Sequence, residues 1–241
     1  MFGFDPIYML IFFVTIAMSG LTSLMVRSRF QKGEEVRLAS GMAGHEVAKQ
    51  MLQDAGVNDV SIVQHEGFLS DHYNPTTKTL ALSPAVYNGR NASSAGVAAH
   101  EAGHALQHAD GYFPMYIRSW LVPAAQVGDM LGPIIIMAGI ALQVFLHVPG
   151  LGHTVAVLGV VLMAAATAFS LVTVPVEFDA SSRAKRQLLH ARITQPGAES
   201  NAVSSVLTAA GLTYVAAAVS AVLNLLYYAW RAGLLGGRSN D

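Results

Sequence analysis

Five consecutive residues, His100-Glu101-Ala102-Gly103-His104, have the residue types and the spacing that metal-dependent hydrolysis needs. On a helix, residues four apart lie on one face, one turn from each other, so both histidines can bind the same ion. Zn²⁺ suits two imidazole nitrogens, and Glu101 projects beside them, where it can take a proton from a zinc-activated water. The alternative is a pair of core histidines beside a surface glutamate. The spacing favours the zinc site.

A helix must carry these residues, and the flanking sequence predicts one. Asn91, Ser93 and Ser94 are suitable N-cap residues, the alanines around the motif favour helix, and Gly111 offers a stop. The segment before this helix is predicted to mix α and β structure.

In that segment, Ser40 could cap a helix over residues 41–55, and residues 60–63 have the pattern of a short strand. The Asn74-Pro75 dipeptide predicts a hairpin turn, after which Leu80 and Leu82 alternate into a core.

The composition points to a membrane protein. Of the 241 residues, 53% are hydrophobic and 12% are charged, against roughly 25% charged in soluble domains. Four apolar runs are long enough to span a bilayer, at residues 7–26, 130–148, 154–174 and 203–230. The first run lacks a basic leader and a small-residue cleavage site, so we expect an uncleaved anchor and not a signal peptide.

These runs divide the chain into five predicted parts. They are a first transmembrane helix (1–26), a catalytic domain (27–118), a transmembrane hairpin (119–174), a returning segment (175–202), and a fourth transmembrane helix with a short tail (203–241). The predicted fold class is a small α+β domain inserted in a four-helix transmembrane bundle, so that the whole chain is mostly α.

Charge placement predicts the orientation. Twelve of the 14 basic residues lie between the first and second runs or between the third and fourth. The positive-inside rule makes that side cytoplasmic, with both termini and the 147–153 turn outside. The absence of cysteine excludes disulfides and thiolate metal sites, and a net charge of −1 gives no sign of a nucleic-acid partner.

A catalytic zinc site needs a third protein ligand, for which the sequence offers three candidates. His108 continues the helical series, but it lies about 12 Å along the axis from the first histidine, so one ion cannot bind both. Asp110 stays open as an oxygen ligand. Glu177 is the better candidate because it follows the third apolar run, on the same side as the motif, and completes a His₂Glu set. Alternatively, Glu177 and Asp179 are simply the acids of a helix that begins after Pro175.

Four segments together resemble the neutral zinc metallopeptidases of bacterial membranes, which are similar in plan to HtpX-type proteases and to the wider gluzincin group. The segments are S-D-H-Y-N-P at 70–75, L-S-x-x-V-Y at 82–87, G-V-A-A-H-E-A-G-H-A at 96–105 and P-V-E-F-D-A-S at 175–181. The resemblance covers nearly the whole chain. It implies a zincin-type domain, Zn²⁺ at His100, His104 and Glu177, Glu101 as general base, and a peptide substrate.

The chain departs from that pattern near the third ligand. HtpX-type enzymes carry Glu-x-x-x-Asp, in which the Asp supports the first histidine, whereas here Ser181 holds the Asp position and an Asp stands at 179. The residue that supports the zinc histidines is therefore left open between Asp179 and Ser181. Asn74 stands where the family often has Asp, so no catalytic role is placed there.

The predicted function is a membrane-integrated zinc endopeptidase acting near the cytoplasmic membrane surface on peptides or membrane proteins, with the lipid bilayer as its surroundings. An oxyanion-stabilising group is also needed, and the candidates are His72, Tyr73, Arg183, Arg186 and His190. By resemblance, residues 79–83 form an edge strand that could pair with an extended peptide. The alternative function is a catalytically silent membrane scaffold or metal-dependent binding protein.

Overall fold

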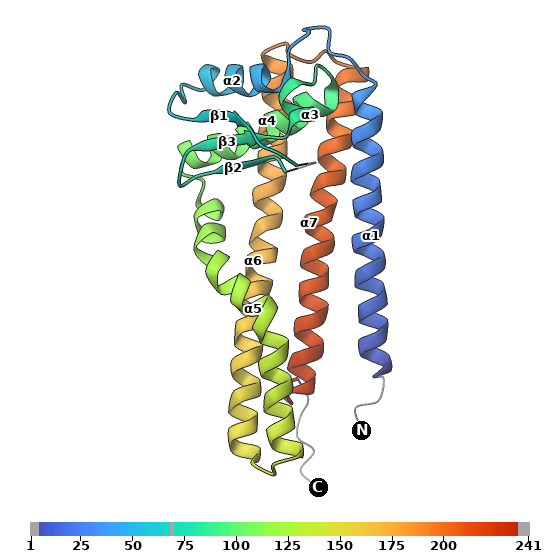
Figure 1. The fold of residues 1–241 in the computed structure, drawn as a ribbon, viewed down its shortest axis with the longest axis vertical. Helices are drawn as coiled ribbons and strands as arrows, with labels where there is room; N and C mark the ends of the chain where they lie inside the picture. The colour runs from blue at the N-terminus through green and yellow to red at the C-terminus, as the bar shows by residue number, and fades with distance from the viewer. Residues whose placement is uncertain (1–4, 68–69, 236–241) are drawn as a thin grey trace. The chain divides into compact units, whose positions relative to one another are not determined.

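The computed structural model describes residues 5–67 and 70–235, and this part of the chain is mostly helical (Figure 1). Its helices are α1 (Pro6–Glu34), α2 (Gly44–Asp54), α3 (Pro84–Asn88), α4 (Ala92–Ala109), α5 (Phe113–Val144), α6 (Pro149–His190) and α7 (Ala198–Arg231). The strands are β1 (Ser61–Gln64), β2 (His72–Asn74) and β3 (Thr79–Leu82).

The chain divides into two compact units. The first comprises residues 1–19, 116–174 and 214–241, and the second comprises residues 20–115 and 175–213. Four helices, α1, α5, α6 and α7, contribute residues to both units, although only the first three residues of α5 belong to the second. All residues of the predicted zinc site belong to the second unit.

The second unit contains a three-stranded sheet, counted over the described residues, with the order β1-β3-β2. β2 and β3 form the predicted antiparallel hairpin, with Tyr73 opposite Leu80. β1 pairs with β3 in parallel, with Ser61 opposite Thr79. The expectation that residues 79–83 form an edge strand is therefore wrong, because β3 has a hydrogen-bonded neighbour on each side. The edges are β1 and β2.

The core of the second unit surrounds α4 and the sheet. Residues Leu80, Ala81 and Leu82 are all buried, so β3 does not show the predicted alternation. β3 is the central strand, and such strands are commonly buried on both faces. Of the three predicted N-cap residues, Asn91 caps α4, since its side chain accepts a hydrogen bond from the amide of Ser94 at 2.9 Å, whereas Ser93 and Ser94 lie inside the helix. Gly111, at φ +67°, follows the end of the helix as predicted.

Two predicted helix starts are wrong. α2 begins at Gly44 with Ala43 as its N-cap, whose amide donates to the carboxylate of Glu46 at 2.7 Å, and Ser40 does not cap it. Gly41, at φ +66°, turns the chain between Ser40 and the helix. α6 runs without a break through Pro175, so Glu177 lies in the interior of a helix and not in a first turn. Proline is tolerated inside such long apolar helices.

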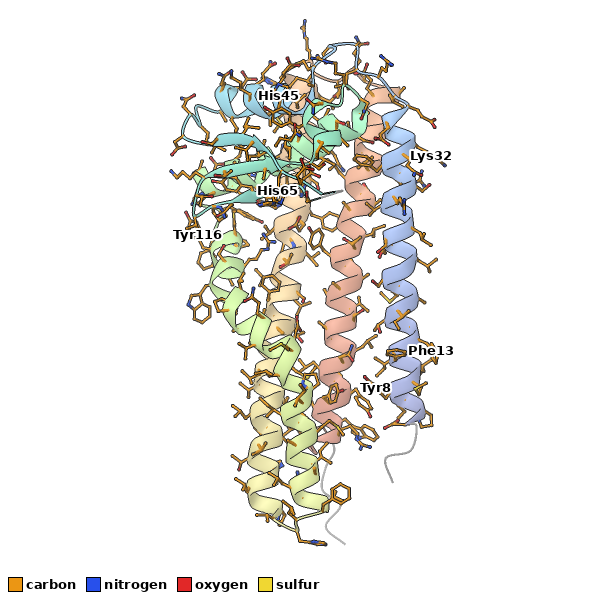
Figure 2. All side chains as sticks on the ribbon, viewed as in Figure 1. Tyr8, Phe13, Lys32, His45, His65 and Tyr116 are labelled. Carbon is orange, nitrogen blue, oxygen red and sulfur yellow. The ribbon has the colours of Figure 1, made fainter. Side chains whose placement is uncertain are left out.

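The first unit contains most of the apolar parts of the long helices. Among the described residues, four helices (α1, α5, α6 and α7) are long and apolar enough to cross a membrane, as the sequence predicts. Gly128 and Gly132 of α5 lie against Leu162 and Met163 of α6, so the missing side chains let the two helices approach closely. Tyr8 packs on Tyr227, whereas Phe13 is exposed on α1 (Figure 2).

Candidate metal centre

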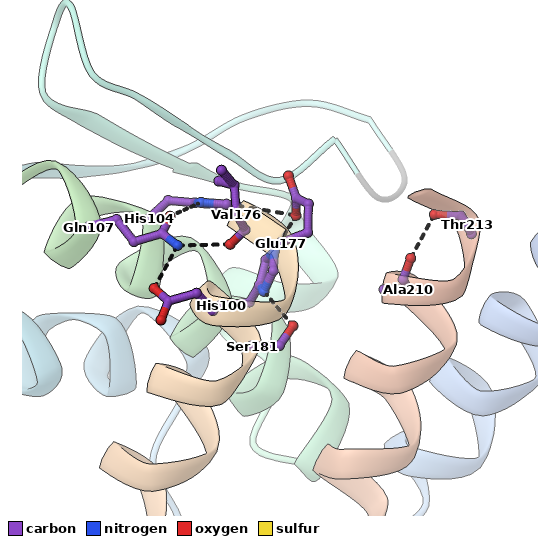
Figure 3. A network of polar contacts seen from close by, with 9 residues as sticks. His100, His104, Gln107, Val176, Glu177, Ser181, Ala210 and Thr213 are labelled. Carbon is purple, nitrogen blue, oxygen red and sulfur yellow. Dashed lines mark hydrogen bonds and ion pairs between the residues drawn. The ribbon is translucent and has the colours of Figure 1, made fainter. Parts of the chain in front are cut away.

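The structure brings two histidines of α4 and a glutamate of α6 to one point. His100 Nε2 lies 3.1 Å from Glu177 Oε2, and His104 Nε2 lies 3.4 Å from the same oxygen (Figure 3). One donor atom from each residue lies within 4.8 Å of the other two. The histidines converge because they stand one turn apart on the face of α4 that packs on α6.

These distances suit a tetrahedral zinc ion. With bonds of about 2.0–2.1 Å, two ligand atoms of such an ion lie about 3.3 Å apart. The nitrogen–oxygen separations of 3.1 and 3.4 Å agree with that value. Two imidazoles and a carboxylate are the ligand set that leaves one position open for water or substrate. The donor set therefore fits Zn²⁺.

The donor groups are shielded from solvent and lie in a negative environment. The side chain of Glu177 is 2% exposed, and those of His100 and His104 are 12% and 9% exposed. Burial acts to lower the pKa of His104, but the hydrogen bond to Glu177 and the charge of Glu101 outweigh burial and raise that pKa. Glu101 is also buried, on the same helix. The centre thus favours a positive charge between its ligands.

Each histidine has a polar partner at its second ring nitrogen. His104 Nδ1 lies 2.9 Å from Gln107 Oε1, and His100 Nδ1 lies 3.1 Å from the hydroxyl of Ser181 (Figure 3). Such partners fix the orientation of a ligating ring. Sequence reasoning proposed Ser181 as a supporting residue but missed Gln107. The signal was present, because residues 104 and 107 are helical neighbours three apart.

Asp179 forms hydrogen bonds to Gln107 and Arg183 and not to a histidine. Its carboxylate accepts from Gln107 Nε2 at 2.9 Å and from Arg183 Nε at 2.6 Å. Arg183 also pairs with Asp110, and its guanidinium lies over the ring of Tyr112. Asp110, the alternative ligand, is 62% exposed and bonded to Arg183, away from the three donor atoms. Arg183, a candidate for oxyanion stabilisation, is engaged by two carboxylates.

The other candidates for oxyanion stabilisation have partners elsewhere or lie far away. The hydroxyl of Tyr73 lies 2.9 Å from His108 Nδ1, and both residues line a separate cavity of about 350 Å³. His72 is exposed, with Nδ1 at 2.8 Å from the carbonyl of Ser70. Arg186 is exposed and bonded to Ser182. His190 ends α6, about 20 Å along the helix from Glu177.

Comparison with known proteins identifies the family of this chain. The family described as "putative neutral zinc metallopeptidase" matches residues 8–232. The chain belongs to this family. The match covers the donor residues on α4 and α6 and the apolar helices.

A curated relative extends the comparison. The chain is 40% identical over 223 residues to a Bacillus subtilis (strain 168) protein named "Putative membrane protease YugP", covering 91% of this chain and 95% of that protein. Together with the four apolar helices, this relative indicates a membrane protein. No solved structure matches the chain significantly.

Proposed function

We propose that this chain is a membrane-integrated, zinc-dependent endopeptidase of gluzincin type. The observation that carries the proposal is the meeting of His100, His104 and Glu177, with Glu101 on the same helix as the histidines. The family membership and the name of the curated relative support the same reaction class.

Hydrolysis of a peptide bond needs a base, an acid and stabilisation of the carbonyl oxygen. Zn²⁺ bound at the three ligands would polarise that carbonyl and bring the pKa of water toward about 7. Glu101 would accept the proton of the attacking water and return it to the departing amine. Glu177 and the two imidazoles would hold the metal, so they would stay out of the proton transfer.

The substrates we propose are extended peptides and membrane-protein segments. Glu177 follows the apolar run 154–174 by three residues on one continuous helix, which supports a site near the membrane surface. The placement of basic residues supports a cytoplasmic site. An extended peptide could add to an edge of the sheet at β2, which lies antiparallel to β3 and has no strand on its other side among the described residues.

The test replaces Glu101 by Gln in the full-length protein in detergent. Gln keeps the size and the helix propensity but cannot accept the water proton, so peptide cleavage should fall on the order of 10²–10⁴-fold. Bound zinc should stay near one ion per chain, because Glu101 is not a ligand. Cleavage is followed with a fluorogenic peptide and zinc by elemental analysis.

The matched control is Glu35→Gln, which makes the same change at an exposed position and should leave cleavage unchanged. Near-wild-type cleavage by Glu101→Gln with zinc bound would contradict the proposal. A wild-type protein that binds zinc but cleaves no peptide would instead support the alternative of a metal-dependent binding protein.

A further inference from the structure

The side-chain amide of Gln107 can adopt only one of its two flipped orientations. Gln107 is completely buried, and its Nε2 donates to the carbonyl of Val176 at 2.8 Å and to Asp179 Oδ2 at 2.9 Å. Both partners are acceptors only, and an amide nitrogen has two protons to give. A reversed amide would set an oxygen against two oxygens in a buried place, which is costly. Gln107 Oε1 must therefore face His104.

This orientation determines which nitrogen of His104 carries the proton. Gln107 Oε1 can only accept, and it lies 2.9 Å from His104 Nδ1, so the proton is on Nδ1. Without a metal, Nε2 can donate a proton to Glu177 at 3.4 Å, and a metal that replaced this proton would bind the lone pair of Nε2 on a neutral ring. We propose that Gln107, held by Asp179, is a positioning residue that presents His104 Nε2 to the metal. The inference rests on the proposed function, since it assumes that a metal binds there.

Asp179 acts on His104 indirectly, through Gln107. Its carboxylate is fixed by Arg183 Nε at 2.6 Å, and Arg183 also pairs with Asp110 at the C-terminal cap of α4. The contacts thus run from the end of α4 across to α6 and back to the second histidine of the motif. The carboxylate of Asp179 therefore supports His104 indirectly, through the side-chain amide of Gln107.

Ser181 gives His100 weaker support. Its hydroxyl lies 3.1 Å from His100 Nδ1, but a hydroxyl can donate or accept, so it does not select a tautomer. The two histidines are therefore held unequally, and loss of Gln107 should matter more than loss of Ser181.

The experiment measures zinc affinity of full-length protein in detergent by competition with a chelator of known affinity. Gln107→Met, which keeps the length of the side chain without its amide, should raise the Kd for zinc about 10–100-fold. Gln107→Glu should also raise it, because the second carboxylate oxygen cannot donate to Asp179. The control is Ser93→Ala, which loses a buried hydrogen bond of 2.6 Å on the same helix, far from the ligands, and should leave the Kd unchanged.

A double-mutant cycle tests the role of Asp179. Asp179→Ala alone should raise the Kd, but added to Gln107→Met it should change the Kd by less than about twofold, because its effect passes through Gln107. If the effects of the two substitutions on the Kd were fully additive, Asp179 would not act through Gln107, and this part of the proposal would be overturned.

A second readout needs no stable variant. In zinc-loaded protein with ¹⁵N-labelled histidine, NMR should show the Nδ1 proton of His104 exchanging slowly with water, because it is buried and hydrogen-bonded. A proton on Nε2, with the metal on Nδ1, would overturn the proposal. Wild-type zinc affinity in Gln107→Met would overturn the role of Gln107 alone, whereas absence of zinc binding by the wild type would overturn the metal site as well.

Discussion

At the scale of single residues, the centre depends on one carboxylate oxygen that both imidazoles face. Glu177 Oε2 lies 3.1 Å from one histidine nitrogen and 3.4 Å from the other. A carboxylate in this position neutralises part of the charge of a divalent ion and fills the third of its four coordination positions. The two histidines alone would leave two of four positions unfilled.

Removing that carboxylate should therefore release the metal. We expect Glu177→Ala to lose most of its bound zinc after dialysis, while the wild type keeps about one ion per chain. Asp110→Ala, which removes an exposed acid bonded to Arg183, should keep its zinc. Elemental analysis of the three dialysed proteins decides between the two acids. Full zinc occupancy in Glu177→Ala together with a metal-free Asp110→Ala would show that the third ligand is Asp110.

Sequence spacing could indicate the motif residues, because a separation of four on a helix fixes which side chains share a face. It could not rank the supporting residues. Asp179 and Ser181 both follow Glu177 closely, but only the packing of α6 on α4 decides that Ser181 reaches His100 and Asp179 reaches Gln107. Gln107 donates to a backbone carbonyl of another helix, and no pattern within α4 encodes that contact.

At the scale of elements, the centre requires α4 and α6 to approach closely. Gly103, inside the motif, lies against Ala180, and a Cβ at position 103 would stand 2.7 Å from the carbonyl oxygen of Ala180. Because that atom belongs to the backbone of a helix, a side chain at 103 must push the helices apart. Such a shift would separate the histidines from Glu177.

We therefore expect Gly103→Ala to destabilise the second unit and weaken zinc binding. Overpacking of about 1–3 kcal/mol should exceed the gain of about 1 kcal/mol in helix propensity. Gly96→Ala is the matched control on the same helix, since its Cβ would lie 3.4 Å from the nearest atom, in Val203. Thermal unfolding and zinc Kd are measured for both. A Gly103→Ala protein as stable and as zinc-bound as Gly96→Ala would contradict the need for close approach.

The elements themselves were predictable to different degrees. The four apolar helices and α4 follow from long apolar runs and from capping residues, which are local signals. The central place of β3 was not predictable, because it depends on a parallel pairing with β1 that no turn between the two strands encodes. Pro175 suggested a helix start, yet α6 continues through it as part of a long helix.

At the scale of the whole molecule, the order of the apolar helices along the chain determines on which side of a membrane each donor residue lies. The donor residues lie in two stretches, one between α1 and the apolar part of α5 and one after the apolar run of α6. If each of the four apolar helices crosses the bilayer once, both stretches are on the same side. The histidines of α4 and Glu177 of α6 can then meet on that one side of the membrane.

The orientation can be tested by labelling single introduced cysteines, since the natural sequence has none. Gln53 is exposed near the end of α2. Gln53→Cys should react with a membrane-impermeant maleimide only after the cells are permeabilised. Gly150→Cys lies at the start of α6, where a Cβ meets no atom within 4 Å, and it should react in intact cells. The two positions are separated by one apolar helix, so they should always give opposite results. Labelling of Gln53→Cys in intact cells, with Gly150→Cys protected, would place the proposed peptidase site outside the cytoplasm.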